Sequence, residues 1–213
     1  MQIRSYGHSC LLVQQGGTRI LLDPGSLSRE FEGVRDLDAI LITHIHADHL
    51  DIDRLARLMD NNPEARVICD EGSAVALSAR HLPCQVMRDG DTTNIGVPVT
   101  AIGTWHAVIH ADLPAVRNVG YLINDRLFHP GDAFTDPGRE VEVLAVPAGA
   151  PWMKIAEAID YLRAIRPAYA IPIHERVLAH PRSAFTMLEQ LGPSGTQVTP
   201  LDGDKMLHVP NIG

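Results

Sequence analysis

The feature that most constrains this chain is an apolar run that leads straight into a group of histidines. Residues 38–43 include four consecutive apolar side chains, which indicates a strand covered on both faces. Apolar side chains then recur at helical spacing over residues 52–59, and Pro63 closes that segment. A buried strand followed by a helix is typical of parallel pairing in an α/β layer. The fold must therefore include such a layer, with the histidines in the connection between strand and helix.

That connection carries four side chains that can bind a metal ion. They are His44, His46, Asp48 and His49, all within six residues. Imidazole and carboxylate groups together suit zinc, iron or manganese. In an extended segment the first three would share one face, because side chains alternate along a strand, and His49 would point elsewhere. A kinked loop could therefore serve two metals rather than one. A metal-free loop is disfavoured, because the four groups would repel when protonated and lose hydration when buried.

One segment cannot complete two coordination shells, so partners are expected from distant parts of the chain. His106, Asp132 and His174 each come at the end of an apolar run that reads as a strand. Open α/β sheets place their sites at the carboxyl ends of strands. A lone histidine is more often structural than a ligand, but these three groups together indicate one shared edge.

The remaining pattern predicts two sheets packed together with helices outside. The predicted strands are residues 9–13, 19–22, 38–43, 66–69, 97–102, 119–124, 126–129, 143–146, 169–173 and 205–209, and the predicted helices are residues 52–59, 73–80, 152–165 and 182–191. No repeat, low-complexity tract or linker divides the chain. Residues 1–213 are therefore expected to form a single domain.

Composition removes several classes of function. The formal net charge is −8, and the 18 lysines and arginines are scattered, which disfavours nucleic-acid binding. No apolar run approaches the roughly 18 residues of a membrane span, and no signal-peptide core is visible. The three cysteines, Cys10, Cys69 and Cys84, fit neither a disulfide framework nor a metal motif. We expect buried or idle thiols in a reducing cytoplasm, and a small-molecule substrate.

These residues resemble the metallo-β-lactamase superfamily, and the resemblance spans nearly the whole chain. The matching residues are the His-x-His-x-Asp-His motif of residues 44–49, His106, the Gly131-Asp132 pair, and His174. Gly7-His8-Ser9 resembles the Gly-His-Ser segment near the start of the short members of the superfamily. These members include the L-ascorbate-6-phosphate lactonase-like proteins and many uncharacterised hydrolases. The resemblance implies an α/β fold, a four-layer αββα sandwich of two mixed β-sheets with outer helices.

The resemblance also implies two divalent metal ions, zinc by default, with manganese or iron possible. The residues implied as ligands are His44, His46 and His106 for the first metal, Asp48, His49 and His174 for the second, and Asp132 as the bridge. Such a pair lowers the pKa of a shared water toward ~7 and polarises the bond that is attacked. We therefore expect a metal-dependent hydrolase that cleaves a small ester, lactone or phosphodiester.

Other roles remain open at this stage. Asp48 is expected to orient the attacking group or relay its proton, and His110 to donate a proton or bind substrate from a loop. Asp23 either supports a metal-bound histidine or forms a turn before Pro24, and His8 lies either at the site rim or in a structural position.

The alternatives to hydrolysis are a non-catalytic metal-binding protein and a di-iron redox protein, although the latter normally needs a flavin domain. A sugar-phosphate substrate would want basic residues near the rim. Arg117, Arg139 and Arg176 are the candidates, and each can equally be a solvated surface charge. Residues 24–36 and 107–118 are the expected mouth of the pocket.

Overall fold

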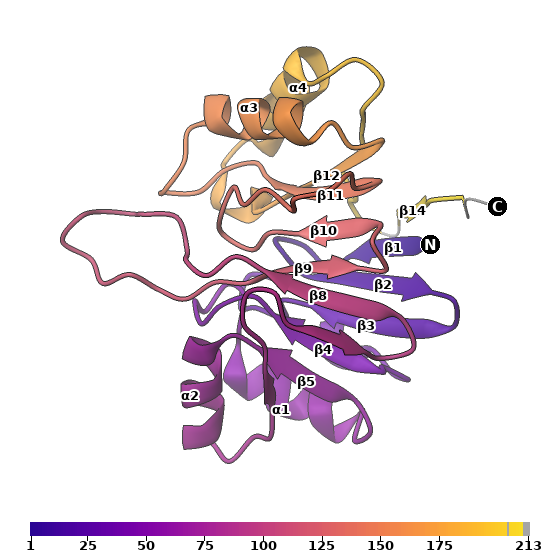
Figure 1. The fold of residues 1–213 in the computed structure, drawn as a ribbon, viewed down its shortest axis with the longest axis vertical. Coiled ribbons are helices and arrows are strands. Elements are labelled where there is room, and N and C mark those ends of the chain that lie inside the picture. Colours follow the sequence, from indigo (N-terminus) through magenta and orange to yellow (C-terminus); the bar gives the residue numbers. More distant parts are fainter. Residues whose placement is uncertain (204, 211–213) are drawn as a thin grey trace.

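The computed structural model describes residues 1–203 and 205–210, and in it two β-sheets lie face to face (Figure 1). The first sheet has the order β14-β1-β2-β3-β4-β5-β6. Its strands are β1 (Gln2–Ser5), β2 (Leu11–Gln15), β3 (Thr18–Leu22), β4 (Ala39–Ile42), β5 (Arg66–Cys69), β6 (Gln85–Val86) and β14 (Met206–His208). Pairing is antiparallel from β14 to β3 and parallel from β3 to β6, so the sheet is mixed.

The second sheet has the order β13-β12-β11-β10-β9-β8-β7. Its strands are β7 (Thr92–Asn94), β8 (Pro98–Ile102), β9 (Gly120–Ile123), β10 (Leu127–His129), β11 (Val143–Pro147), β12 (Tyr169–Ile173) and β13 (Gln197–Val198). Here too pairing changes from antiparallel, over β7 to β10, to parallel, over β10 to β13. The expectation of two mixed sheets is confirmed.

Helices cover the outer face of each sheet (Figure 1). The helices are α1 (Ile52–Asp60) and α2 (Glu71–Ala79) on the first sheet, α3 (Ile155–Ile165) and α4 (Pro181–Leu191) on the second, and two short 3-10 turns, η1 (Phe31–Gly33) and η2 (Glu175–Val177). Asp51 and Asp70 cap α1 and α2 by accepting hydrogen bonds from backbone amides of the first turn. The result is the four-layer αββα sandwich that the sequence led us to expect. Among the described residues no helix is long and apolar enough to cross a membrane.

The alternation of side chains along β4 shows how one strand joins three layers. Ala39 and Leu41 point into the core between the two sheets, whereas Ile40 and Ile42 pack in the cluster that contains α1 and α2. All four side chains are buried. This double burial explains the uninterrupted apolar run, and it fixes the place where the histidine motif leaves the sheet.

Several element boundaries differ from those predicted. The prediction that a helix begins at residue 152 is wrong, because α3 begins at Ile155, where the Glu157 carboxylate accepts a hydrogen bond from the Lys154 amide. The helix predicted from residue 73 begins at Glu71 because Asp70 caps it. The short strands β1, β6, β7 and β13 were not predicted, and β14 occupies only part of the predicted residues 205–209.

Candidate metal centre

The histidine motif lies in a folded-back loop between β4 and α1. Asp23, which follows β3, anchors the start of this loop, because its carboxylate accepts hydrogen bonds from the Thr43 amide and hydroxyl, both at 2.8 Å. The His49 amide donates to the His46 carbonyl at 2.9 Å, and the Ala47 carbonyl accepts from the Ser26 amide at 2.8 Å. These bonds turn the loop, so its four candidate ligands do not alternate as they would in a strand.

The first group of candidate ligands comprises His44, His46, His106 and Asp132. One ligand atom from each of them lies within 4.8 Å of the others. His44 Nε2 lies 3.1 Å from His46 Nδ1, and His106 Nε2 lies 3.3 Å from Asp132 Oδ2. The connections after β4, β8 and β10 thus meet at one edge, and both sheets contribute to the group.

The second group comprises His8, Asp48, His49 and His174, and its ligand atoms meet the same distance limit of 4.8 Å. Asp48 Oδ2 lies 3.0 Å from His8 Nε2 and 3.3 Å from His174 Nε2. The His174 amide donates to the His8 carbonyl at 3.2 Å, which holds the loops before β2 and after β12 together. His8 therefore lies within the cluster of candidate ligands, at the first of the two positions that the sequence left open.

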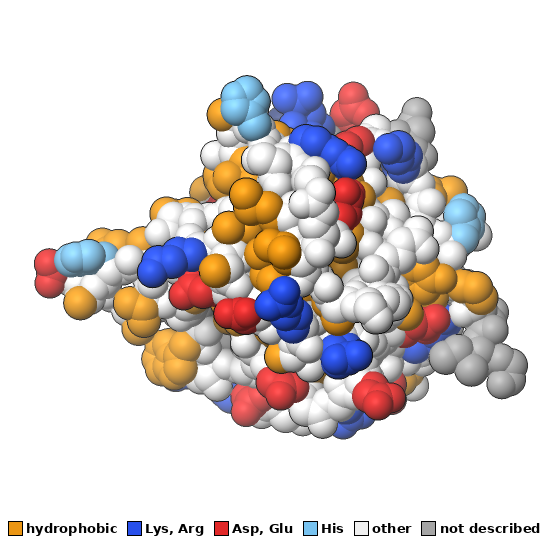
Figure 2. All heavy atoms as spheres, turned by 90° about the horizontal axis from the view of Figure 1, so that it is seen from above, with side chains coloured by type: hydrophobic (Ala, Val, Ile, Leu, Met, Phe, Trp, Pro, Cys, Tyr) orange, Lys and Arg blue, Asp and Glu red, His pale blue; other side chains and the backbone are white. Residues whose placement is uncertain are grey.

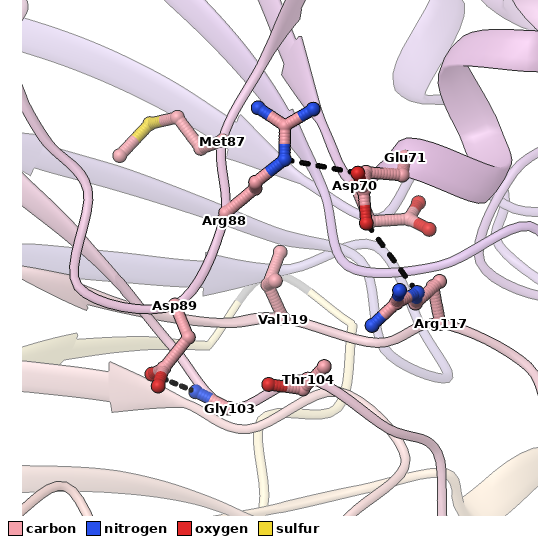
Figure 3. A pocket seen from close by; sticks show the side chains of 9 residues that line it. All are labelled: Asp70, Glu71, Met87, Arg88, Asp89, Gly103, Thr104, Arg117 and Val119. Atoms are coloured by element: carbon pink, nitrogen blue, oxygen red, sulfur yellow. Dashed lines mark hydrogen bonds and ion pairs between the residues drawn. The ribbon is translucent and has the colours of Figure 1, made fainter.

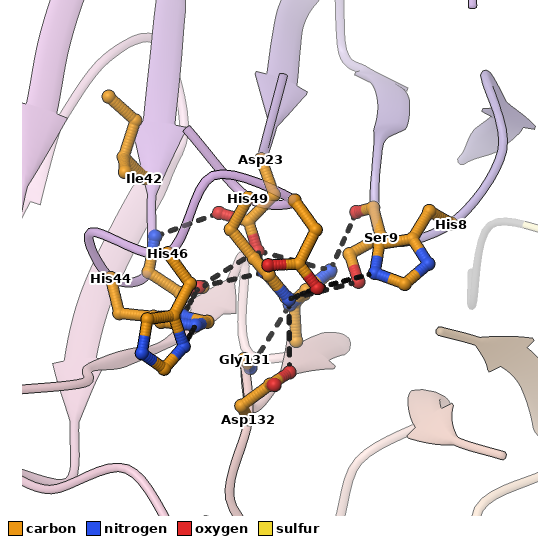
Figure 4. A network of polar contacts seen from close by, with 12 residues as sticks. His8, Ser9, Asp23, Ile42, His44, His46, His49, Gly131 and Asp132 are labelled. Carbon is orange, nitrogen blue, oxygen red and sulfur yellow. Dashed lines mark hydrogen bonds and ion pairs between the residues drawn. The ribbon is translucent and has the colours of Figure 1, made fainter. Parts of the chain in front are cut away.

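Asp132 joins the two groups. Its Oδ1 atom lies 3.0 Å from His49 Nε2, and its Oδ2 atom lies 3.1 Å from His174 Nε2 and 3.3 Å from His106 Nε2. Figure 4 shows Asp132 facing His49 from the opposite side to Asp23. One carboxylate thus reaches imidazole nitrogens of both groups.

Four of these histidines are oriented through the ring nitrogen that faces away from the cluster. The contacts are His49 Nδ1 with Asp23 Oδ2 at 2.7 Å, His174 Nδ1 with the Gly149 carbonyl at 2.7 Å, His106 Nδ1 with the Ala107 carbonyl at 2.5 Å, and His44 Nδ1 with the Thr43 hydroxyl at 3.0 Å. Metal-binding histidines commonly have such partners, which fix the ring and leave the other nitrogen toward the metal. Asp23 therefore orients the His49 ring and is not only a turn residue.

The donor set fits divalent metal ions. Among the described residues, His106 Nε2, His174 Nε2 and Asp132 Oδ1 are buried side-chain atoms that make no well-formed hydrogen bond. Buried polar atoms are nearly always satisfied, so these three atoms point to a ligand at the centre of the cluster. Imidazole nitrogens with a few carboxylate oxygens match the ligand preferences of zinc, manganese and iron.

The charges of the cluster support the same fit. Burial opposes protonation of His49, yet the Asp132 and Asp23 carboxylates raise the pKa of His49 well above its usual value. Burial likewise opposes protonation of His174, but the Asp132 and Asp48 carboxylates beside it raise its pKa to about 9. The negative charge that raises both pKa values would equally attract a divalent cation, which binds deprotonated imidazoles.

His110 is not brought together with the other candidates. It lies in an arm, residues 105–117, that projects beyond the sheets between β8 and β9 (Figure 1). Its side chain is 65% exposed, and its Nδ1 atom accepts a hydrogen bond from the Asp112 amide at 3.1 Å. A catalytic role for His110 therefore remains a prediction that depends on the arm.

Trp152 is a site residue that the sequence analysis missed. Its indole Nε1 donates to Asp132 Oδ2 at 2.8 Å, and its ring centroid lies 5.9 Å from that of His106. The residue was placed inside a predicted helix, but it lies in the loop after β11. The sequence signal that could have identified Trp152 is its position soon after an apolar strand, as Asp132 and His174 also follow strands.

The three arginines considered for a phosphate-binding rim are already engaged. Arg117 Nε lies 3.4 Å from Glu71, Arg139 Nη1 lies 2.6 Å from Asp125, and Arg176 Nε lies 3.6 Å from Glu175. Figure 3 shows Arg117 with Arg88 and Glu71 at a cavity of about 320 Å³, whose lining contains none of the candidate ligands. Each of the three guanidinium groups lies beside a carboxylate, so none of them is positioned to bind an anion at the cluster.

The chain is similar to several known proteins in sequence and in fold. A family model described as the β-lactamase superfamily domain matches residues 2–174. The chain is 49% identical to protein Rv0786c of Mycobacterium tuberculosis, over 84% of this chain and 86% of that protein. It is 30% identical to the UPF0173 metal-dependent hydrolase of Archaeoglobus fulgidus, over 82% and 83% of the two chains. Among solved structures, Igni18, a metallo hydrolase of Ignicoccus hospitalis, has a TM-score of 0.75 at 19% identity, covering 98% of this chain and 99% of its own.

Proposed function

This chain belongs to the metallo-β-lactamase superfamily as a metal-dependent hydrolase, and from that premise we propose that it cleaves a small ester, lactone or phosphodiester with two divalent metal ions. Zinc is the proposed metal. The observation that carries the proposal is the position of Asp132, whose two carboxylate oxygens lie 3.0–3.3 Å from imidazole nitrogens of both ligand groups. A carboxylate shared in this way suits two neighbouring cations better than one.

The residues divide into two sets around that carboxylate. His44, His46 and His106 would hold the first metal, Asp48, His49 and His174 would hold the second, and Asp132 would be shared by both. When bound, such a pair supplies an attacking water with a lowered pKa and stabilises negative charge on the substrate. The surrounding contacts of Asp23, Gly149 and Ala107 keep the imidazoles in place before substrate arrives.

Asp48 is the proposed proton-handling residue. Its side chain is 26% exposed, more than that of His49, His174 or Asp132, so it faces the open side of the cluster. Its Oδ2 atom lies between His8 Nε2 and His174 Nε2, which fix its orientation. It can accept a proton from the attacking water. His8 then acts as a positioning residue for Asp48, and Trp152 acts as one for Asp132.

Metal content tests the proposal directly. Elemental mass spectrometry on the purified chain should find close to two zinc ions per chain, and His46→Ala and Asp132→Ala should lose one or both. His81→Ala removes an exposed histidine outside the cluster and serves as the control. Wild type that repeatedly binds no metal after dialysis with zinc or manganese would refute the ligand assignment. A metal-loaded chain that cleaves no member of an ester, lactone and phosphodiester panel would refute the hydrolase and favour a non-catalytic metal protein.

A further inference from the structure

The arm, residues 105–117, carries several large apolar side chains that are exposed to solvent. Backbone hydrogen bonds close its base, from the His106 amide to the Val116 carbonyl at 2.9 Å and from the Asn118 amide to the Thr104 carbonyl at 3.2 Å. Beyond that base, Val108 is 77% exposed and Leu113 is 53% exposed. Figure 2 shows hydrophobic side chains along this projection, at the left of the view. Single exposed apolar residues are ordinary, but a group of them marks a binding surface.

A cavity of about 400 Å³ lies along the arm. Apart from His106 and His110, its lining side chains are all apolar, and they include Val108, Ile109 and Leu113. His106 is also a member of the first ligand group. The cavity and the candidate metal centre thus share His106, and the volume of the cavity falls in the range of small-molecule sites.

The charges near the centre argue against an anionic substrate. Arg176, which follows His174 by two residues, pairs with Glu175, and its guanidinium packs against Gly7. Arg117, at the base of the arm, pairs with Glu71 and stacks over the Trp105 ring at 4.0 Å. Neither arginine therefore adds positive charge at the rim to help the proposed metals bind a phosphate ester.

We infer that the arm binds an apolar group of the substrate beside the metal centre, so that the substrate is an uncharged carboxylic ester or lactone with an aliphatic or aromatic substituent. This inference rests on the proposed hydrolase and narrows its substrate class. The polar end of the substrate lies toward His106 and the cluster, and the apolar end lies against Val108, Ile109 and Leu113. Binding covers side chains that otherwise face water.

Alkyl hydroxamates of increasing length test this arrangement without turnover. Calorimetric titration of the zinc-loaded chain should show hexanohydroxamate binding on the order of tenfold more tightly than acetohydroxamate. Each fully buried methylene group raises affinity roughly fourfold, but the arm covers the additional methylene groups of the longer compound only in part. Val108→Asp and Leu113→Ser should remove most of that gain and leave acetohydroxamate binding unchanged. Val75→Asp, on α2, changes a valine that is 73% exposed and should have no effect.

Several results would overturn the inference. The first is equal affinity for the short and the long hydroxamate. The second is that Val108→Asp keeps the higher affinity for the long one. The third is a wild-type dimer that Val108→Asp makes monomeric, which would assign the arm to contact with a second copy of the chain. Turnover of p-nitrophenyl acetate, p-nitrophenyl hexanoate and bis(p-nitrophenyl) phosphate separates the two proposals. A preference for the phosphodiester overturns the substrate class alone. A length-dependent affinity with no turnover of any ester supports the apolar site and refutes the hydrolase.

Discussion

Replacing Asp23 should damage both the stability of the chain and its affinity for metal. The Asp23 side chain is fully buried and accepts three hydrogen bonds, from the Thr43 amide, the Thr43 hydroxyl and His49 Nδ1, at 2.7–2.8 Å. In Asp23→Ala all three donors lose this acceptor. The hydroxyl can turn to His44 Nδ1 at 3.0 Å, so the amide and the imidazole bear the loss.

Each buried donor left without a partner costs about 1–3 kcal/mol, so Asp23→Ala should lose about 4 kcal/mol of the free energy of unfolding. Asp23→Asn keeps one carbonyl oxygen of the same shape and should lose about half as much. Because His49 then loses the partner that fixes its ring, affinity for the second metal should fall about 10–100-fold.

Urea unfolding of the metal-free variants, followed by circular dichroism, measures the first quantity, and competition with a zinc chelator measures the second. Asp38→Ala is the control. Asp38 is exposed and accepts from the Arg19 amide at 2.8 Å, where water can replace it, so a change within about 0.5 kcal/mol is expected. The reasoning fails if Asp23→Ala unfolds within 1 kcal/mol of wild type and binds zinc as tightly.

Four further predictions concern single positions. A Cβ on Gly25 would lie 1.8 Å from a backbone oxygen of the motif loop, so Gly25→Ala should abolish zinc binding, whereas Gly33→Ala, with open space around it, should not. Trp152→Phe keeps the ring but loses the indole hydrogen bond, and chelator competition should show zinc affinity lowered about tenfold. His110→Ala should leave zinc content unchanged and lower kcat by about 10²-fold or more if the arm delivers this proton donor; an unchanged kcat would exclude that role. The folded-state pKa of His174, about 9, lies above its unfolded value of about 6.5, so its contribution to the stability of the metal-free chain should be full below about pH 6.5 and lost as pH rises through 9. Urea unfolding should show a smaller loss over that range in His174→Gln, where the raised pKa of His49 remains.

The sequence predicted the elements whose side chains are buried on a regular period. β5 and β12 lie at the predicted residues, and β4 lies within them, because burial on both faces leaves an unbroken apolar run. β13 is only two residues long and is held by backbone pairing to β12, so its side chains carry no such pattern.

The candidate ligands could be predicted where several of them lie in one short segment. They could not be predicted where a backbone turn brings a distant side chain to the site. The motif of residues 44–49 is visible in the sequence, and its place at the end of β4 follows from burial. His8 reaches Asp48 from a left-handed turn, with φ at 56°, that no local pattern announces. Trp152 meets Asp132 across 20 residues of chain, a contact that depends on how β10 and β11 pair.

Both sheets supply candidate ligands, so these side chains lie on both sides of the interface between the sheets. Those between β1 and β2 and after β4 belong to the first sheet, whereas His106, Asp132 and His174 follow strands of the second. A bound metal pair would therefore act as a cross-link between the two sheets, in addition to their packing and to hydrogen bonds such as the one from the Tyr121 hydroxyl to the Ile42 carbonyl. It would close a loop of more than a hundred residues, between the motif and His174, in the way that a disulfide does. Chelation should then lower the free energy of unfolding by weakening the contact between the two sheets, rather than the pairing of strands within either sheet.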